Sequence, residues 1–199
     1  MSLEDYRTVF VASSLVLMLI VAVPAFSLIV AFPRGSERFS EFWLLDQNHL
    51  MEDYPFNVGV NESYRVFVGV GNHLGGSSHY MVYVKFRNQT EPLPNATASE
   101  SSPLAPLYEF QFFVADGEIW ESLLMFEILD VSVQDDSVFV GNVSINGVAF
   151  SVDCFSMWDS EHNGFYYQLF FELWLYDMMS QSFQYHDRFV GIWLNMTSS

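Results

Sequence analysis

The residues with the most specific chemistry are asparagines followed two places later by serine or threonine. An Asn-x-Ser/Thr motif is the acceptor for N-linked glycans when the middle residue is not proline. The 167 residues after Phe32 hold 10 Asn and 22 Ser plus Thr, so chance predicts roughly one motif. Five are present, at Asn61, Asn88, Asn95, Asn142 and Asn195. The excess predicts glycosylation at these positions, although Asn and Ser also gather in turns for conformational reasons.

The ionisable residues form no recognised metal-binding pattern. His73 and His79 flank the Gly75-Gly76 turn and offer at most two of the ligands that a zinc site needs; the alternative is two polar residues beside a turn. The acids Asp153, Asp159 and Glu161 are expected to share one loop and could hold calcium through oxygen ligands, or form a solvated acidic turn. The sequence therefore predicts no metal and no cofactor.

Catalytic patterns are equally lacking. Cys154 is the single cysteine, so no intrachain disulfide can form, and we expect a buried core thiol. A blue-copper site at Cys154 and Met157 is rejected because two nearby histidines are missing. No Gly-x-Ser-x-Gly elbow occurs, and no pair of carboxylates has a defined separation. We therefore expect a protein that is not an enzyme.

The charge of the chain excludes one class of partner. The net charge is −17, from 24 acidic residues against 7 Lys plus Arg. Such a surface repels phosphate backbones, so no nucleic-acid partner is expected. Lys85 is the only lysine.

The uncharged run from Thr8 to Phe32 is the segment expected to hold the rest of the chain at a membrane. Its 25 residues would reach roughly 37 Å as a helix, enough to cross a bilayer. The alternative is a signal peptide cleaved near Val23-Pro24-Ala25, but Glu4 and Asp5 do not make a positive amino-terminal region. We expect a short tail (1–7), a transmembrane helix (8–32) and one large domain (33–199).

The orientation of this anchor rests on two signals that disagree. Counting Arg7 on one side against Arg34 and Arg38 on the other would place the large domain inside. The five Asn-x-Ser/Thr motifs favour the outside. We give the motifs more weight and predict a single-pass protein of the cell membrane with an extracellular carboxy-terminal domain.

The large domain shows the alternating patterns and turn residues of an all-β fold. Residues 64–71 and 79–87 are expected to pair as a hairpin, and Asn146-Gly147 predicts a type I′ turn between two further strands. Strands are expected at 39–45, 58–60, 64–71, 79–87, 107–115, 118–133 (with a bend or a short helical turn), 138–145, 148–152, 165–176 and 183–195. Their spacing is typical of an immunoglobulin-like β-sandwich.

Two further stretches bear on the surface of the domain, and the second has two possible interpretations. Residues 88–106 hold four prolines and are expected to be a surface connection. The strand from Phe165 to Tyr176 carries large aromatic residues on both faces. Its second face is either an exposed interface or buried in this domain.

Several segments also carry a family resemblance. They are Phe39–Asp46, Glu52–Pro55, Val68–His73, Trp158–Leu175 and Phe189–Asn195. These segments resemble the archaeal family of membrane proteins called domain of unknown function 1616. The resemblance implies an archaeal, surface-exposed β-sandwich and implies no activity. Many members have several membrane helices before the domain, whereas one is expected here, which leaves open whether the chain acts alone or as one subunit.

Two hypotheses of function follow. In the first, the chain is a glycosylated structural or accessory subunit that packs against protein partners, or against itself, in a membrane or surface assembly. In the second, it is an extracellular module that binds a carbohydrate or similar ligand on exposed aromatic rings.

Overall fold

The computed structural model describes residues 6–7, 9–20 and 37–196. The chain forms two compact units, Met1–Arg38 and Phe39–Ser199. In the first unit, residues 6–7 and 9–20 are helical. Among the described residues, no helix combines the length and the apolar character that a membrane crossing requires. Residue 8 and residues 21–32 of the predicted anchor lie outside the described residues.

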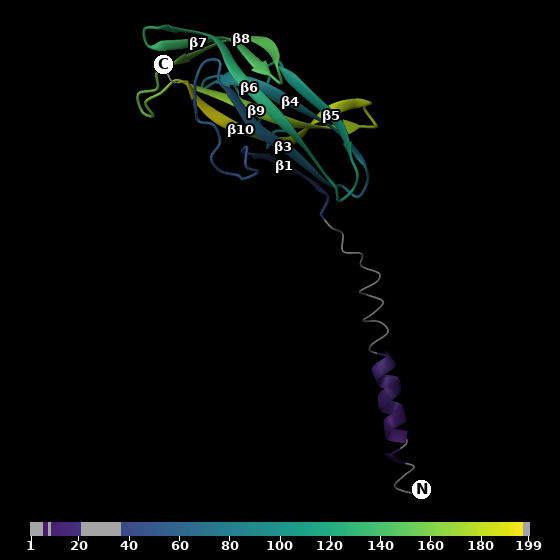
Figure 1. Cartoon of the computed structure of the whole chain (residues 1–199). Helices are drawn as coiled ribbons and strands as arrows, with labels where there is room; N and C mark the ends of the chain where they lie inside the picture. Colours follow the sequence, from purple (N-terminus) through teal and green to yellow (C-terminus); the bar gives the residue numbers. More distant parts are fainter. Residues whose placement is uncertain (1–5, 8, 21–36, 197–199) are drawn as a thin grey trace. The chain divides into compact units, whose positions relative to one another are not determined.

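The second unit is all-β and consists of two five-stranded sheets (Figure 1). Sheet 1 has the order β1-β3-β6-β7-β8 and sheet 2 the order β2-β10-β9-β4-β5. The strands are Phe39–Leu45 (β1), Asn57–Val58 (β2), Ser63–His73 (β3), Ser78–Asn88 (β4), Tyr108–Val114 (β5), Ile119–Gln134 (β6), Ser137–Ile145 (β7), Val148–Met157 (β8), Tyr166–Asp177 (β9) and Ser182–Met196 (β10). The ten strands match the expected segments within a few residues, except that β8 runs five residues beyond the expected Val152.

The two sheets share one hydrophobic core, which makes the domain a β-sandwich. Val66, Val68 and Val70 from β3 and Val82 and Val84 from β4 are fully buried members of the same cluster. They come from alternate positions, because successive side chains of a strand point to opposite faces. The valines that alternate in the sequence thus form the core-facing sides of both strands.

The predicted hairpin between residues 64–71 and 79–87 is wrong. β3 belongs to sheet 1 and β4 to sheet 2, so the turn after His73 crosses between sheets. The side chain of Asn72 explains why the turn holds this shape: its Nδ2 donates to the carbonyls of Gly76 (2.8 Å) and Val114 (2.9 Å). Two alternating runs around a Gly-Gly turn cannot show which sheet each will join.

The hairpin predicted at Asn146-Gly147 is confirmed. Ile145 pairs with Val148, and both turn residues have positive φ, 50° for Asn146 and 80° for Gly147, as a type I′ turn needs. Of the alternatives for residues 118–133, the structure shows a strand with no helical turn, within which Asp130 has a positive φ of 51°. β6 is one continuous strand from Ile119 to Gln134.

The structure answers the question about the strand from Phe165 to Tyr176. One face of β9 joins the shared core. On the other face Gln168, Phe170 and Glu172 are also buried. The connection 89–106 contacts this face at Glu172, where the backbone N–H of Ser102 donates to Glu172 Oε1 at 2.7 Å. Beyond this cover, Trp174 is half-buried. The proline-rich connection is thus a lid on sheet 2 as well as a surface loop.

Candidate functional site

A hollow of about 300 Å³ lies where several strand ends of the second unit meet. Its lining comes from five separate parts of the chain: the residue before β2, the residue after β4, the loop between β8 and β9, the start of β9 and the end of β10. The lining residues are Phe56, Gln89, Asp159, His162, Tyr166 and Trp193. Three are aromatic and three are polar, a mixture typical of small-molecule pockets. We call this hollow the aromatic pocket.

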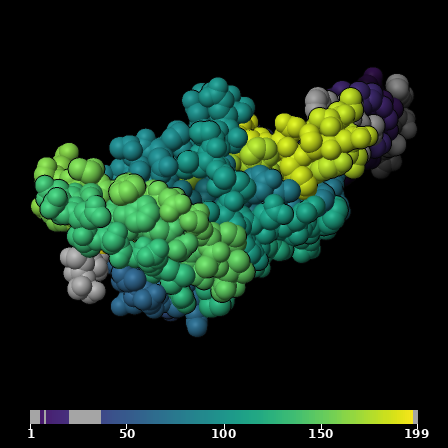
Figure 2. Space-filling model, turned by 90° about the horizontal axis from the view of Figure 1, so that it is seen from above, coloured from purple at the N-terminus to yellow at the C-terminus, as the bar shows by residue number. Residues whose placement is uncertain are grey.

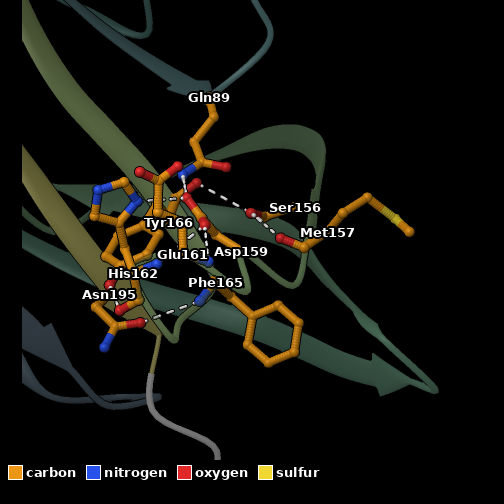
Figure 3. A network of polar contacts seen from close by, with 9 residues as sticks. All are labelled: Gln89, Ser156, Met157, Asp159, Glu161, His162, Phe165, Tyr166 and Asn195. Carbon is orange, nitrogen blue, oxygen red and sulfur yellow. Dashed lines mark hydrogen bonds and ion pairs between the residues drawn. The ribbon is translucent and has the colours of Figure 1, made fainter.

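Asp159 organises the polar side of the aromatic pocket (Figure 3). Its Oδ1 accepts the backbone N–H groups of Glu161 (2.9 Å) and His162 (3.1 Å). Its Oδ2 accepts from His162 Nδ1 (3.0 Å) and Gln89 Nε2 (2.9 Å). An aspartate at the start of a loop often bonds to the backbone two or three residues on. Here the same carboxylate also ties the loop to the end of β4.

These contacts change the protonation of both partners. The hydrogen bond from the His162 side chain, followed by that from Gln89, lowers the pKa of Asp159 below its ordinary value of 3.8. The same hydrogen bond, together with the negative charge of Asp159, raises the pKa of His162 above 6.5. Asp159 is therefore a fully engaged acceptor, which suits a positioning role and not a general base.

The aromatic side of the pocket is partly open. Phe56 is 47% exposed and Trp193 41% exposed. The rings of Phe56 and Tyr166 lie 6.0 Å apart between centroids, and the Tyr166 hydroxyl donates to the carbonyl of His162 at 2.7 Å. The guanidinium of Arg87 lies 5.5 Å from the Trp193 ring centre, a cation–π distance that holds the indole in place.

The Asn-x-Ser/Thr motifs occupy different environments. Asn61 and Asn95 are exposed, whereas Asn88, Asn142 and Asn195 are half-buried. The side-chain Nδ2 of each half-buried residue is hydrogen-bonded: Asn88 to the carbonyl of Phe155, Asn142 to Asp130 Oδ2 and Asn195 to Asn57 Oδ1. Thr197, the third residue of the last motif, lies outside the described residues. Asn88 and Asn195 are close in sequence to the pocket residues Gln89 and Trp193.

The candidate metal ligands are not brought together. His73 lies near Glu41 (Nε2–Oε2 3.6 Å) and stacks on Phe39, while His79 stacks on Phe113. Asp153 lies within β8 and not in the loop that holds Asp159 and Glu161, so the expected shared loop begins later than predicted. Among the residues described by the structure, no group of three His, Cys, Asp or Glu side chains has a metal-binding arrangement.

Two nucleophile types are present, but both are enclosed. Cys154 is buried, as predicted, and burial first, then the charge of Glu91, raises its pKa to about 12. Ser40 Oγ lies 2.9 Å from His186 Nε2, the contact that an activated serine needs. Ser40 is fully buried, however, and its hydroxyl also bonds to Tyr80 at 2.7 Å. A substrate cannot reach either atom in this packing.

Sequence reasoning identified Asp159 only as a possible calcium ligand and missed the rest of the aromatic pocket. Phe56 and Trp193 are 137 positions apart, and no periodic pattern connects them. One signal was available in the segment that follows Trp158, where Asp159 and the Asn163-Gly164 pair indicate a structured loop directly before an aromatic strand. The pocket itself arises only when β2, β9 and β10 come together.

Residues 33–135 match the family model named domain of unknown function (DUF1616), slightly more than half of the chain. The chain belongs to the DUF1616 family. The match includes the quoted segments between Phe39 and His73; the later segments, from Trp158 on, lie beyond it. Of the pocket residues, Phe56 and Gln89 fall within the DUF1616 match. No curated protein matches this chain.

Solved structures show weak similarity to this DUF1616 member. The CARDB domain of a Pyrococcus furiosus protein, solved with di-metal ions, is 8% identical with a TM-score of 0.39, over 81% of this chain and 90% of that one. A chain from the human seminal plasma complex of zinc 2-glycoprotein and prolactin inducible protein is 9% identical with a TM-score of 0.38. The match covers 82% of this chain and 98% of that one. A Listeria innocua β-glucosidase in complex with glucose is 13% identical with a TM-score of 0.33. The match covers 80% of this chain and 16% of that one. Such scores assign neither a fold nor a ligand.

Proposed function

We propose that this chain is a non-enzymatic binding domain, held at the outer face of the cell membrane by residues 8–32 and carrying N-linked glycans. The observation that supports binding best is the aromatic pocket. Partly exposed rings stand beside polar groups that are already held in place by Asp159. A site arranged in advance needs little ordering when a ligand arrives, and this saves part of the entropic cost of binding.

The non-enzymatic part of the proposal follows from the engagement of the reactive groups. The carboxylate of Asp159 accepts four hydrogen bonds, and the Ser40–His186 contact is closed to substrates. A general base must reach the proton that it removes. The described residues thus provide better support for holding a ligand than for converting one.

The location is supported by the sequence. Residues 8–32 are uncharged and long enough to cross a bilayer, the five Asn-x-Ser/Thr motifs exceed chance, and the resemblance is to archaeal membrane proteins. An epitope tag added after Ser199 should be accessible to antibody on intact cells. A tag that is detected only after the cells are permeabilised would contradict the outward orientation.

We further propose that the sandwich is immunoglobulin-like. Sheet 2 places β4, β9 and β10 side by side, and sheet 1 places β1 beside β3. The same neighbours occur for strands C, F, G and A, B of immunoglobulin domains. The departure is in β6, β7 and β8, which follow one another as a meander in sheet 1.

A second candidate function is contact with a protein partner, favoured by an apolar end of the domain. Phe113 is 73% exposed, and Met178 and Met179 at the tip of the β9–β10 hairpin are 84% and 94% exposed. Figure 2 shows the yellow atoms of this hairpin at one end of the sandwich. Exposed apolar side chains often mark interfaces, and flexible methionines suit adaptable ones.

Native mass spectrometry of the full chain, released from its own membranes, tests the binding function. We expect a small molecule to stay bound to the wild type and to be lost from Trp193→Ala and Phe56→Ala. Phe155→Ala is the matched control, because Phe155 is an exposed ring that is not among the residues lining the pocket. Equal retention in all variants, or no bound molecule in the wild type, would overturn the proposal.

A further inference from the structure

The aromatic pocket has features that define the class of ligand it accepts. We propose that it binds a neutral saccharide, one or two pyranose rings at the end of a glycan. This inference rests on the proposed binding function and adds the chemistry of the ligand. Its support comes from the exposed aromatic rings of the pocket, the polar atoms that have no partner in the described part of the chain, the local charge and the volume of the pocket.

The rings match the apolar side of a sugar. A pyranose presents C–H groups on its faces, and these groups pack on the electron-rich faces of aromatic rings. Phe56 and Trp193 are both partly exposed, and the indole is held by Arg87. A ring that is already fixed loses little side-chain freedom on binding. Two exposed rings in one hollow therefore favour a ligand with flat C–H surfaces.

The polar atoms match the hydroxyl groups of a sugar. His162 uses Nδ1 toward Asp159, and its Nε2 has no hydrogen-bond partner among the described residues. Gln89 uses Nε2 toward Asp159, which leaves its Oε1 as an acceptor. A hydroxyl both donates and accepts, so adjacent sugar hydroxyls can satisfy a donor and an acceptor at one rim. A purely apolar ligand would leave these groups without partners.

The charge around the pocket favours a neutral ligand. The chain carries a net charge of −17, and Glu161 stands in the same loop as Asp159. Asp159 balances the charge of protonated His162 through their 3.0 Å contact. The nearby Arg87 is occupied by Gln168 Oε1 (3.2 Å) and the carbonyl of Gln89 (2.7 Å). An anionic sugar would meet the repulsion of the acidic domain, and the described residues that line the pocket include no Lys or Arg to offset it.

The volume limits the length of the ligand. About 300 Å³ is at the low end of ligand pockets, which range over roughly 300–1,000 Å³. The end of a glycan fits this better than the middle of a long polysaccharide. Two sources share this chemistry: a separate surface glycan, or N-linked glycans of this chain or of a neighbouring copy, since Asn88 and Asn195 stand beside pocket residues in the sequence.

The test uses the full chain in a detergent without a sugar headgroup, with the indole N–H signal of Trp193 followed by NMR. The probes are methyl α-glucoside, methyl α-mannoside, methyl β-galactoside, N-acetylglucosamine and, as the charged comparison, glucuronic acid. We expect at least one neutral sugar to give a saturable shift and to bind at least tenfold more tightly than glucuronic acid. The affinity for that sugar should fall at least tenfold in Phe56→Ala and stay unchanged in Phe155→Ala. Both variants must first show the same unfolding curve as the wild type.

The source of the sugar is separated by repeating the titration with Asn88→Gln and Asn195→Gln. A gain of binding in these variants means that the chain's own glycans fill the pocket, and unchanged binding points to a separate glycan. Both results support a saccharide ligand. No saturable shift with any neutral sugar, in wild type and variants alike, overturns it. If mass spectrometry then still finds a molecule that is lost from Trp193→Ala, the binding function stands and only the saccharide class falls.

Discussion

Lys85 and Glu172 form an ion pair inside the domain, with Lys85 Nζ 2.9 Å from Glu172 Oε2. Both side chains are almost completely buried, and Lys85 is the only lysine in the chain. Ser102 completes the group, since its carbonyl accepts from Lys85 Nζ (2.8 Å) and its N–H donates to Glu172 Oε1 (2.7 Å). The pair thus fastens the connection 89–106 to β4 and β9.

Replacing Glu172 by leucine should destabilise the domain strongly. The change leaves the Lys85 ammonium buried with a single carbonyl partner, and breaking a buried pair on one side costs about 3–5 kcal/mol. Urea unfolding followed by tryptophan fluorescence measures the loss. The double variant Lys85→Met with Glu172→Leu should recover part of it, because neither charge of the pair remains, while the Ser102 N–H and Trp174 Nε1 still lack their acceptor. A double variant as unstable as the sum of the single ones would contradict this account.

The contact between Asp159 and His162 should stabilise the domain over a defined pH range. The pKa of His162 is raised above 6.5, so its contribution is complete below 6.5 and is lost as the pH rises through the raised pKa. The pKa of Asp159 is lowered below 3.8, so its contribution is complete above 3.8 and is lost as the pH falls through the lowered pKa. The contact is fully effective between about pH 4 and 6.5.

NMR titration of the histidine ring protons checks this directly. His162 should titrate above its ordinary pKa in the wild type and move down in Asp159→Asn, which removes the charged acceptor. An unchanged His162 titration in Asp159→Asn would refute the assigned cause.

The five glycosylation motifs should differ in occupancy. Asn61 and Asn95 are exposed and should carry glycans in material from the native host. Asn142 should be the least modified, because it lies within β7, donates to Asp130 and precedes the buried Ser144. Mass spectrometry of the corresponding peptides measures this order. Five unmodified asparagines would remove the motif argument for an extracellular domain.

Gly69 should not tolerate a side chain. It pairs with Trp43 across β1 and β3, and a methyl group at Gly69 would overlap the indole of Trp43. Gly69→Ala should therefore cost about 1–3 kcal/mol in unfolding free energy, the range for overpacking. Gly76→Ala is the matched control, since nothing lies within 4 Å of its added methyl group. Trp43→Leu in the Gly69→Ala background should recover part of the loss if the overlap is the cause.

The sequence by itself determined the class of the fold and most strand positions. Alternation with period 2 reports which face of a strand is buried, as at Val66, Val68 and Val70, and Asn146-Gly147 determines its hairpin through local φ preferences. These signals depend only on residues close together in the sequence, so they can be interpreted without knowledge of the fold. The burial of Cys154 was likewise correctly expected from the nature of an unpaired thiol in this chain.

Only the tertiary structure decided how strands are shared between sheets and what covers them. β3 and β4 are neighbours in the sequence but join different sheets, because the backbone bonds that decide pairing involve β6 and β9. The aromatic pocket and the Lys85–Glu172 pair have the same origin. Lys85 and Glu172 are 87 positions apart in the sequence, and the pocket residues Phe56 and Trp193 are 137 positions apart, so long-range packing brings them together.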